Sequence, residues 1–146
     1  MGAICCATAQ FEHRANDKVY NLAVIERFTE DAARRSARIV AFPEMCVTGY
    51  WHVRNLDRPA IEALAEAVPD GPSVETLTRL AKRCGLAVGA GLIEQDEDGR
   101  LYNAYVVALP DRSKRTASCT PSRTSAYRAA RDSRCLTRPG AFERRS

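Results

Sequence analysis

The sequence predicts an α/β fold, because apolar stretches of strand length alternate along the chain with segments of helical periodicity. Four strands are expected, at residues 4–11, 39–42, 86–93 and 101–109. An acidic turn that ends at Gly99 joins the last two strands. Two apolar strands around such a turn predict a β-hairpin.

The longest helix is expected over residues 16–37. Asn16 or Asp17 can cap its start, because either side chain offers an oxygen to the free N–H groups of the first turn. The helical spacing predicts a stripe facing the sheet, formed by Val19, Leu22, Ala23, Ile25, Glu26 and Phe28.

Two shorter helices are expected on either side of a turn at residues 69–72. The first covers residues 59–68 and starts with a proline, whose missing N–H is harmless at that position. The second begins with Ser73 as its cap, continues through Arg83 and ends at Gly85, a residue suited to the left-handed conformation that terminates helices.

The composition is that of an ordinary soluble protein, with 45% hydrophobic and 27% charged residues in a chain of 146. The chain contains no apolar run long enough to cross a bilayer, and its start lacks the features of a secretory signal. These observations predict a cytoplasmic protein without a membrane partner. The six cysteines form no metal-binding spacing with His13 or His52, so free thiols are expected, and neither a metal nor a cofactor is implied.

The segment Val40 to Tyr50 carries the clearest chemical signal. An apolar strand ends at Phe42-Pro43, and Glu44 follows directly, ahead of a turn that contains Gly49. A carboxylate at the end of a buried strand is expected to be partly desolvated, which raises its pKa and suits it to proton transfer near neutral pH.

Together with other blocks in the same order, this segment resembles the nitrilase, or carbon–nitrogen hydrolase, superfamily. The resemblance covers roughly residues 3–111. Its other blocks are the Thr48-Gly49-Tyr50 turn, the Asp70-Gly71-Pro72 turn before a helix, the strand from Gly89 to Glu94, Leu101-Tyr102-Asn103-Ala104, and Pro110-Asp111. The resemblance implies the N-terminal half of an α-β-β-α sandwich, and it implies hydrolysis of nitriles or amides by a Cys–Glu–Lys triad.

By this resemblance Glu44 is the catalytic base, which takes the thiol proton and then activates water. Tyr50 and Trp51, with His52, are candidates for the wall of a substrate pocket, although aromatic packing in the loop or at a subunit contact explains them equally well. The family also commonly dimerises, so a homo-oligomer is a possible state of the chain.

Three other residues invite a role but favour simpler explanations. Glu94 is expected to be an exposed carboxylate at the end of the hairpin strand. Asn103 is expected to bond to the backbone, as polar groups inside sheets must find partners. Cys46 lies two residues from Glu44, but the family's nucleophile comes from a later strand, so a small buried thiol is the favoured interpretation.

The chain changes character after Asp111. Residues 1–111 hold 12 Lys/Arg and 16 Asp/Glu, a balance of −4, whereas residues 112–146 hold 10 and 2, a balance of +8. The second part contains no Val or Ile, shows no period, and lacks the family's lysine and cysteine motifs. We therefore expect residues 1–111 to be the N-terminal portion of the hydrolase domain, and residues 112–146 to be a basic, disordered tail.

A change of reading frame near Arg112 explains this tail. With suitable codons, residues 115–122 read one base earlier give HRKLHAF, and residues 131–139 give RFTVFDTP, which are a lysine-containing stretch and a strand of the expected kind. The chain itself is then an inactive, truncated homologue that exposes apolar sheet and is prone to aggregation. The alternative is a non-catalytic interaction protein whose Arg-rich tail binds nucleic acid or a full-length homologue, but the tail has no repeated basic motif, so a nucleic-acid partner is not favoured.

Overall fold

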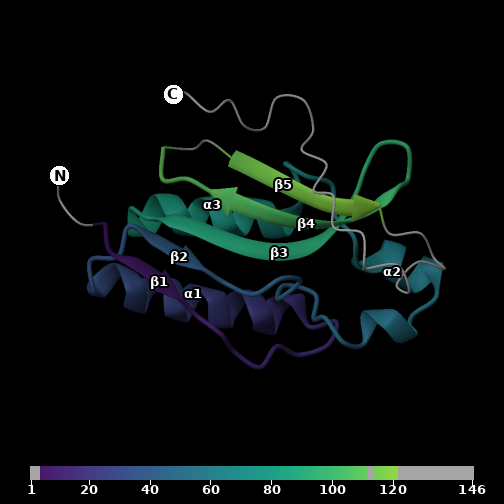
Figure 1. Cartoon of the computed structure of the whole chain (residues 1–146), viewed down its shortest axis with the longest axis horizontal. Helices are drawn as coiled ribbons and strands as arrows, with labels where there is room; N and C mark the ends of the chain where they lie inside the picture. Colours follow the sequence, from purple (N-terminus) through teal and green to yellow (C-terminus); the bar gives the residue numbers. More distant parts are fainter. Residues whose placement is uncertain (1–3, 112–113, 122–146) are drawn as a thin grey trace.

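The computed structural model describes residues 4–111 and 114–121, the latter by their backbone alone. It contains one mixed sheet with two long helices packed on one side (Figure 1). The elements in chain order are β1 (Cys6–Thr8), α1 (Lys18–Arg34), β2 (Ile39–Ala41), the short 3-10 helix η1 (Val53–Asn55), α2 (Arg58–Leu64), α3 (Pro72–Cys84), β3 (Ala87–Gln95), β4 (Leu101–Ala108) and β5 (Lys114–Pro121).

The five strands follow one another across the sheet in chain order. β1, β2 and β3 are parallel, and helices connect them, because a parallel pair cannot be joined by a tight turn. β3 and β4 form the predicted antiparallel hairpin, in register from Val88 with Ala108 to Gln95 with Leu101. The hairpin turn is closed by the Asp96 carbonyl, which accepts from the Gly99 N–H at 3.0 Å, and Gly99 takes a positive φ of 76°.

The main core lies between one face of the sheet and helices α1 and α3. Because side chains alternate along a strand, only every second residue of β3 and β4 points toward these helices. The buried side chains contributed by the strands are Val40, Val88, Ala90, Leu92, Ala104, Val106 and Ala108, and those from the helices are Ile25, Ala32, Val74, Leu77, Leu80 and Ala81.

Helix α1 begins two residues later than expected and presents a different face to the core. Asp17 is its cap, and its carboxylate accepts from the Tyr20 N–H at 2.9 Å. The expected stripe is correct only in part: Ile25 is buried and Leu22 packs against the core, but Val19 is 82% exposed. The buried residues are Asn21, Val24, Ile25, Thr29 and Ala32. Two of these are polar and satisfied by hydrogen bonds, so a search for apolar periodicity shifts the inferred face around the helix.

Helix α3 starts at Pro72 with Gly71 as its cap residue, so the expectation that Ser73 caps it is wrong. The Ser73 hydroxyl instead donates to a carboxylate of a different segment, as described below. The expected stop at Gly85 is confirmed, because Gly85 adopts the left-handed conformation with φ of 68° and donates its N–H to the Ala81 carbonyl.

A fifth strand follows the point where the sequence pattern ends. Residues 114–121 pair antiparallel with β4, although no strand was expected beyond Asp111. Backbone N–H and C=O groups at the edge of β4 can pair with any extended segment, and this pairing requires no apolar period in the added strand. The remainder of the expected tail, residues 122–146, lies outside the described part of the chain, and the proposed frame change stays a prediction.

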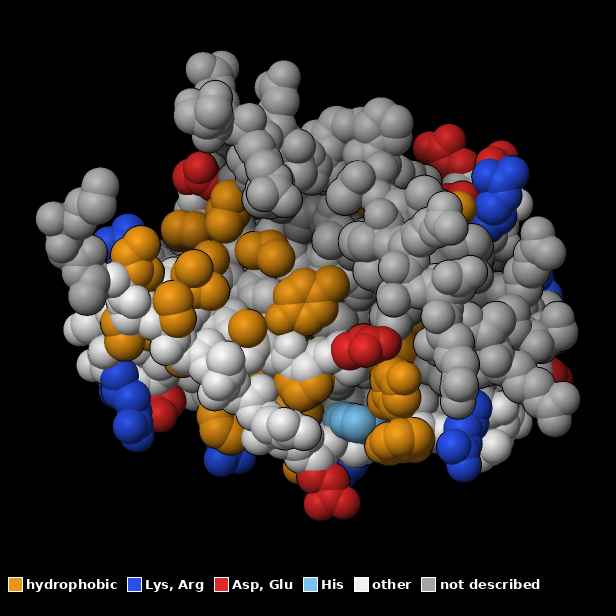
Figure 2. All heavy atoms as spheres, in the orientation of Figure 1, with side chains coloured by type: hydrophobic (Ala, Val, Ile, Leu, Met, Phe, Trp, Pro, Cys, Tyr) orange, Lys and Arg blue, Asp and Glu red, His pale blue; other side chains and the backbone are white. Residues whose placement is uncertain are grey.

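The second face of the sheet is covered only in part. Near the hairpin end of β3 and β4, the loop after β2 and helix α2 form a smaller apolar cluster of Met45, Val53, Ile93 and Leu101. Over β1 and β2, apolar side chains reach the surface, where Ile39 is 40% exposed (Figure 2). Among the described residues, no helix lies across this part of the sheet (Figure 1).

The loop after β2 passes directly over Gly91 of β3. A Cβ atom at position 91 would lie 2.2 Å from the Met45 nitrogen and 2.8 Å from the Glu44 Cα. The Gly91 carbonyl in turn accepts from the Val47 N–H at 3.1 Å. Glycine is therefore required here, since any side chain would collide with backbone that has no room to move.

We expect the Gly91→Ala substitution to destabilise the chain by about 3 kcal/mol or more, because the added methyl group forces the backbone of Glu44 and Met45 off β3. Denaturant unfolding measures the difference. The matched control is Gly85→Ala, where an added Cβ meets no atom within 4 Å and only the positive φ is unfavourable, at about 1 kcal/mol. Equal losses for the two variants would contradict the steric argument.

Candidate active site

Glu44 lies just beyond the C-terminal end of β2, where the chain leaves the sheet. Two hydrogen bonds fix the residues before it: Phe42 donates its N–H to the Gly89 carbonyl, and the Tyr105 hydroxyl donates to the Phe42 carbonyl, both at 2.8 Å. Tyr105 also lies over Gly89, whose missing side chain leaves room for the ring. The strand end that presents Glu44 is thus held by both β3 and β4.

The Glu44 carboxylate is held by the side chain of Asn103 on β4, whose Nδ2 donates to Glu44 Oε1. Asn103 was expected to bond to the backbone, and that expectation is wrong. The sheet register explains the contact, because Asn103 pairs with Ile93 and Ile93 is two residues from Gly91, over which Glu44 passes. The two residues are 59 positions apart, and no local sequence pattern could connect them.

Glu44 is exposed, so the expected partial burial of its carboxylate is not seen in this chain. Glu44 lies on the side of the sheet that faces away from α1 and α3, which is called the open face.

A tight turn from Met45 to Gly49 follows, closed by the Gly49 N–H, which donates to the Met45 carbonyl at 2.8 Å. The turn is anchored to α1 by Asn21, whose side chain is completely buried. Asn21 donates to the Val47 carbonyl at 3.0 Å and to the Arg14 carbonyl at 2.8 Å, and its oxygen accepts from the Arg14 N–H at 2.8 Å. One amide thereby joins the helix, the segment before it and the turn after Glu44.

The aromatic loop, defined as Tyr50 and Trp51, continues from this turn. The two rings meet edge to face with centroids 5.1 Å apart, and Arg54 lies 5.8 Å from the Trp51 ring centroid. Tyr50 packs on the smaller apolar cluster, whereas Trp51 is 66% exposed. Their proposed role in a substrate pocket stays a prediction.

Cys46 is confirmed as a buried thiol. Its side chain has no exposed surface, and its Sγ lies 3.9 Å from the Gly91 carbonyl. Burial raises the pKa of the Cys46 thiol to about 11, because a thiolate would be poorly solvated there. Cys46 is therefore a packing residue, and it is unsuited to act as a nucleophile beside Glu44.

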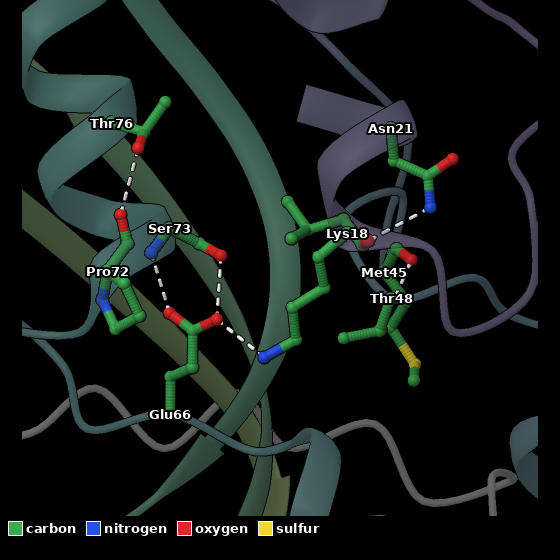
Figure 3. Close-up of polar contacts among 9 residues, drawn as sticks. Lys18, Asn21, Met45, Thr48, Glu66, Pro72, Ser73 and Thr76 are labelled. Carbon is green, nitrogen blue, oxygen red and sulfur yellow. Dashed lines mark hydrogen bonds and ion pairs between the residues drawn. The ribbon is translucent and has the colours of Figure 1, made fainter. Parts of the chain in front are cut away.

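A buried carboxylate, that of Glu66, connects the two long helices (Figure 3). Glu66 Oε2 accepts from the Ser73 N–H at 2.8 Å, and Oε1 accepts from the Ser73 hydroxyl at 2.7 Å. Lys18 at the start of α1 donates to Oε1 at 2.5 Å. Glu66 therefore acts as the side-chain cap of α3, supplying the acceptor that the cap residue Gly71 lacks.

Glu66 borders an acidic cavity of about 560 Å³ between the hairpin turn and the segment before α3. Its carboxylates are those of Glu66, Asp70, Glu94, Asp96, Glu97 and Asp98. Glu94 is 3% exposed, so the expectation of an exposed carboxylate is wrong; it follows Leu92 on the face of β3 that points toward α3. No group of three or more His, Cys, Asp or Glu residues in the described part of the chain is placed to hold a metal ion.

The fold and the placement of Glu44 define a class: an α/β protein with a carboxylate held at the end of a strand, on the open face of the sheet. The carbon-nitrogen hydrolase family model matches residues 5–128, and the chain belongs to this family. The match includes the strands and helices described above and the region around Glu44. Among residues 4–111 and 114–121, no helix is both long and apolar enough for a membrane span.

Curated relatives include omega-amidases and a nitrilase. The chain is 34% identical over 85 residues to the omega-amidase NIT2 of Xenopus tropicalis, covering 58% of the chain and 28% of the relative. It is 34% identical over 95 residues to a nitrilase of Pyrococcus abyssi, covering 64% of the chain and 34% of the relative. The chain thus spans about a third of the length of these relatives.

Solved structures show the same fold. A CN-hydrolase superfamily protein from Xanthomonas campestris, XC1258, superposes with a TM-score of 0.62 at 25% identity, over 75% of this chain and 37% of that one. An N-terminal amidase superposes with a TM-score of 0.66 at 20% identity, over 82% of this chain and 28% of that one. The described sheet and helices correspond to part of an α-β-β-α sandwich.

We expect thiol reagents to distinguish the cysteines of the folded chain. Cys5 and Cys6 are exposed and should react at neutral pH, whereas Cys46 should react only after unfolding, because it is buried and its pKa is raised. Mass spectrometry of the labelled chain, with and without denaturant, locates each modification. Rapid labelling of Cys46 in the folded chain that disappears in Glu44→Gln would reopen its assignment as a nucleophile.

We expect Glu66→Ala to lower the free energy of unfolding by about 3 kcal/mol, because it leaves buried donors of Ser73 without an acceptor and Lys18 without its partner. Lys18→Met should have a smaller effect, since the Lys18 side chain is 24% exposed and the serine bonds to Glu66 remain. Denaturant unfolding compares the two variants. A larger loss for Lys18→Met would show that the ion pair, rather than the helix cap, is the main contribution.

Proposed function

We propose that this chain represents the base-bearing portion of a thiol-dependent hydrolase of nitriles or amides, with Glu44 as the general base. The observation that carries the proposal is the fixed presentation of Glu44: its backbone passes over Gly91, and its carboxylate accepts from Asn103. A base that must act on a thiol and then on a water needs a defined direction, and side-chain hydrogen bonding provides it.

In the proposed reaction the Glu44 carboxylate removes the proton of a cysteine thiol as the sulfur attacks the nitrile or amide carbon. For an amide, the proton passes to the departing ammonia, which leaves an acyl-enzyme. Glu44 then takes a proton from water, and the hydroxide adds to the acyl carbon. The carbon–sulfur bond breaks to release a carboxylic acid, and Glu44 returns its proton to the cysteine sulfur. A lysine stabilises the negative charge that develops on the substrate heteroatom.

The thiol and the lysine of this scheme are not assigned to residues of this chain. Cys46 is buried and faces Gly91, and Lys114 has no surrounding lysine motif. We therefore propose that the chain by itself is catalytically inactive and that a complete active site requires further polypeptide of the family fold. The exposure of Glu44 supports this proposal, because a functional base of this kind is shielded from bulk water.

The nucleotide sequence of the gene tests the frame change. We expect that one inserted or deleted base near codon 112 restores a lysine-containing strand and, further on, a cysteine at a strand end. A gene whose alternative frames contain early stop codons and no such cysteine would contradict the truncation, although it would leave the family membership unaffected.

We expect the purified chain, incubated with simple amides and nitriles, to release no more ammonia than its Glu44→Gln variant. The Glu62→Gln variant, which changes a carboxylate of α2 that pairs with Arg58, is the matched control. Ammonia release that is present in the chain and in Glu62→Gln but absent in Glu44→Gln would show that the chain is an active hydrolase and would overturn the proposed inactivity.

A further inference from the structure

We propose that His13 is a positioning residue that holds the aromatic loop of Tyr50 and Trp51 while its imidazole is neutral and releases the loop when the imidazole is protonated. The loop follows Glu44 by six residues, so its release changes the surroundings of the proposed base. An effect of this release on substrate rests on the proposed function, whereas the release of the loop itself does not.

Two segments that are distant in the sequence meet at this point. The segment before α1 donates from the Asn16 N–H to the Thr48 carbonyl at 3.0 Å, which fixes the end of the turn after Glu44. Two residues further along, the Tyr50 N–H donates to Nε2 of His13, also at 3.0 Å. This second bond attaches the aromatic loop to a titratable side chain.

The direction of the bond defines the form of the imidazole that can make it. A ring nitrogen that accepts a hydrogen bond carries no proton, so the bond requires the tautomer of His13 with its proton on Nδ1. Protonation at Nε2 would place an N–H group against the N–H of Tyr50. Two donors cannot bond to each other, and the contact is lost.

A second imidazole lies beside that of His13. His52 Nε2 contacts Asn16 Oδ1, so His52 also connects the loop to the segment before α1. Gly49 lies between the two rings: a Cβ there would be 2.9 Å from His52 Cε1 and 3.0 Å from His13 Cδ2. The pKa of His52 is lowered, first by burial and then by the charge of His13. A positive charge on His13 therefore disfavours protonation of His52.

The conformation of Gly49 allows the loop to move. Gly49 has a φ of 89°, a region open to glycine, and it separates the anchored turn from the aromatic residues. Trp51 is 66% exposed, so little packing resists its displacement. On either side of it, Val53 is buried in the smaller apolar cluster and Tyr50 packs against that cluster, which limits the movement to the segment around Trp51.

Other charged groups also lie on the elements that meet here. They are Glu12, Arg14 and Asp17 on the segment of His13, Glu44 and Arg54 on the facing loop, and Lys18 at the start of α1. Arg14 lies over the Tyr20 ring and 3.9 Å from Asp17, and Lys18 pairs with Glu66. Carboxylate, guanidinium and ammonium groups ordinarily hold one charge between about pH 5 and 8, whereas imidazole does not.

The chain provides its own probe, because Trp51 is its only tryptophan and His13 and His52 are its only histidines. Time-resolved fluorescence anisotropy of the full chain reports the mobility of Trp51 directly. We expect slow, restrained motion at pH 8 and a larger fast component at pH 5, with far-UV circular dichroism unchanged. Loss of the dichroism signal over the same range would show unfolding instead and would contradict a local release.

Variants of His13 distinguish the effect of its hydrogen bond with Tyr50 from the effect of the imidazole charge. His13→Gln keeps an acceptor for the Tyr50 N–H but cannot titrate, so the loop should stay restrained at both pH values. His13→Phe keeps a ring but has no acceptor, so the loop should be mobile at both. His52→Gln, the matched control, should retain the transition. A transition that persists in His13→Gln, or that disappears only in His52→Gln, overturns the proposal.

A direct measurement covers the case in which a variant does not fold. In the unmodified chain, the ¹⁵N chemical shift of His13 Nε2 should be that of an unprotonated nitrogen at pH 8. The Tyr50 amide proton should lose its protection from exchange as this nitrogen is protonated. A proton on Nε2 at pH 8 overturns the proposal. Neither result depends on ammonia release, so the proposed hydrolase function can fail while the His13 proposal holds, or the reverse.

Discussion

The passage of the loop after β2 over Gly91 is the constraint on which the arrangement of the site depends. The backbone of Glu44 and Met45 lies where any side chain at position 91 would stand. This contact sets the height of the loop above the sheet and brings Val47 within hydrogen-bonding distance of the Gly91 carbonyl. Asn103 and Tyr105, on the neighbouring strand, then reach Glu44 and the residue two before it. One methyl group added at position 91 would therefore push the loop off β3 and separate Glu44 from its partners on β4.

Much of the fold could be predicted from the sequence, because its elements are encoded locally. The hairpin of β3 and β4 follows from two apolar strands and a turn ending at Gly99, and the end of α3 follows from Gly85. The buried face of α1 could not be predicted in the same way. Asn21 and Thr29 occupy it as satisfied polar residues, and their partners lie on the backbone of segments whose position is set by the tertiary structure.

The residues of the candidate site also divide into those that the local sequence predicts and those that only the tertiary structure reveals. Glu44 could be identified because its strand and turn are contiguous, but Asn103, 59 residues away, reaches it only through the register of the sheet. Glu66 was missed for a related reason: a glutamate ahead of a proline-glycine turn resembles a surface residue until Lys18 and Ser73 surround it. The expectation that β-structure ends at Asp111 failed because an edge strand is held by its backbone, whatever its side chains.

The ion pair of Lys18 with Glu66, and those of Arg83 with Glu26 and Glu30, connect α1 to segments at least 48 residues further along the chain. All of these partners, and the described side chains of the main core, belong to residues 4–111. The helix-covered side of the sheet can therefore form during synthesis once these residues have left the ribosome, before any later polypeptide reaches the open side. In this order of folding, the apolar side chains over β1 and β2 are exposed in the nascent chain until later polypeptide covers them. A chaperone that binds the chain at that stage would bind to β1 and β2.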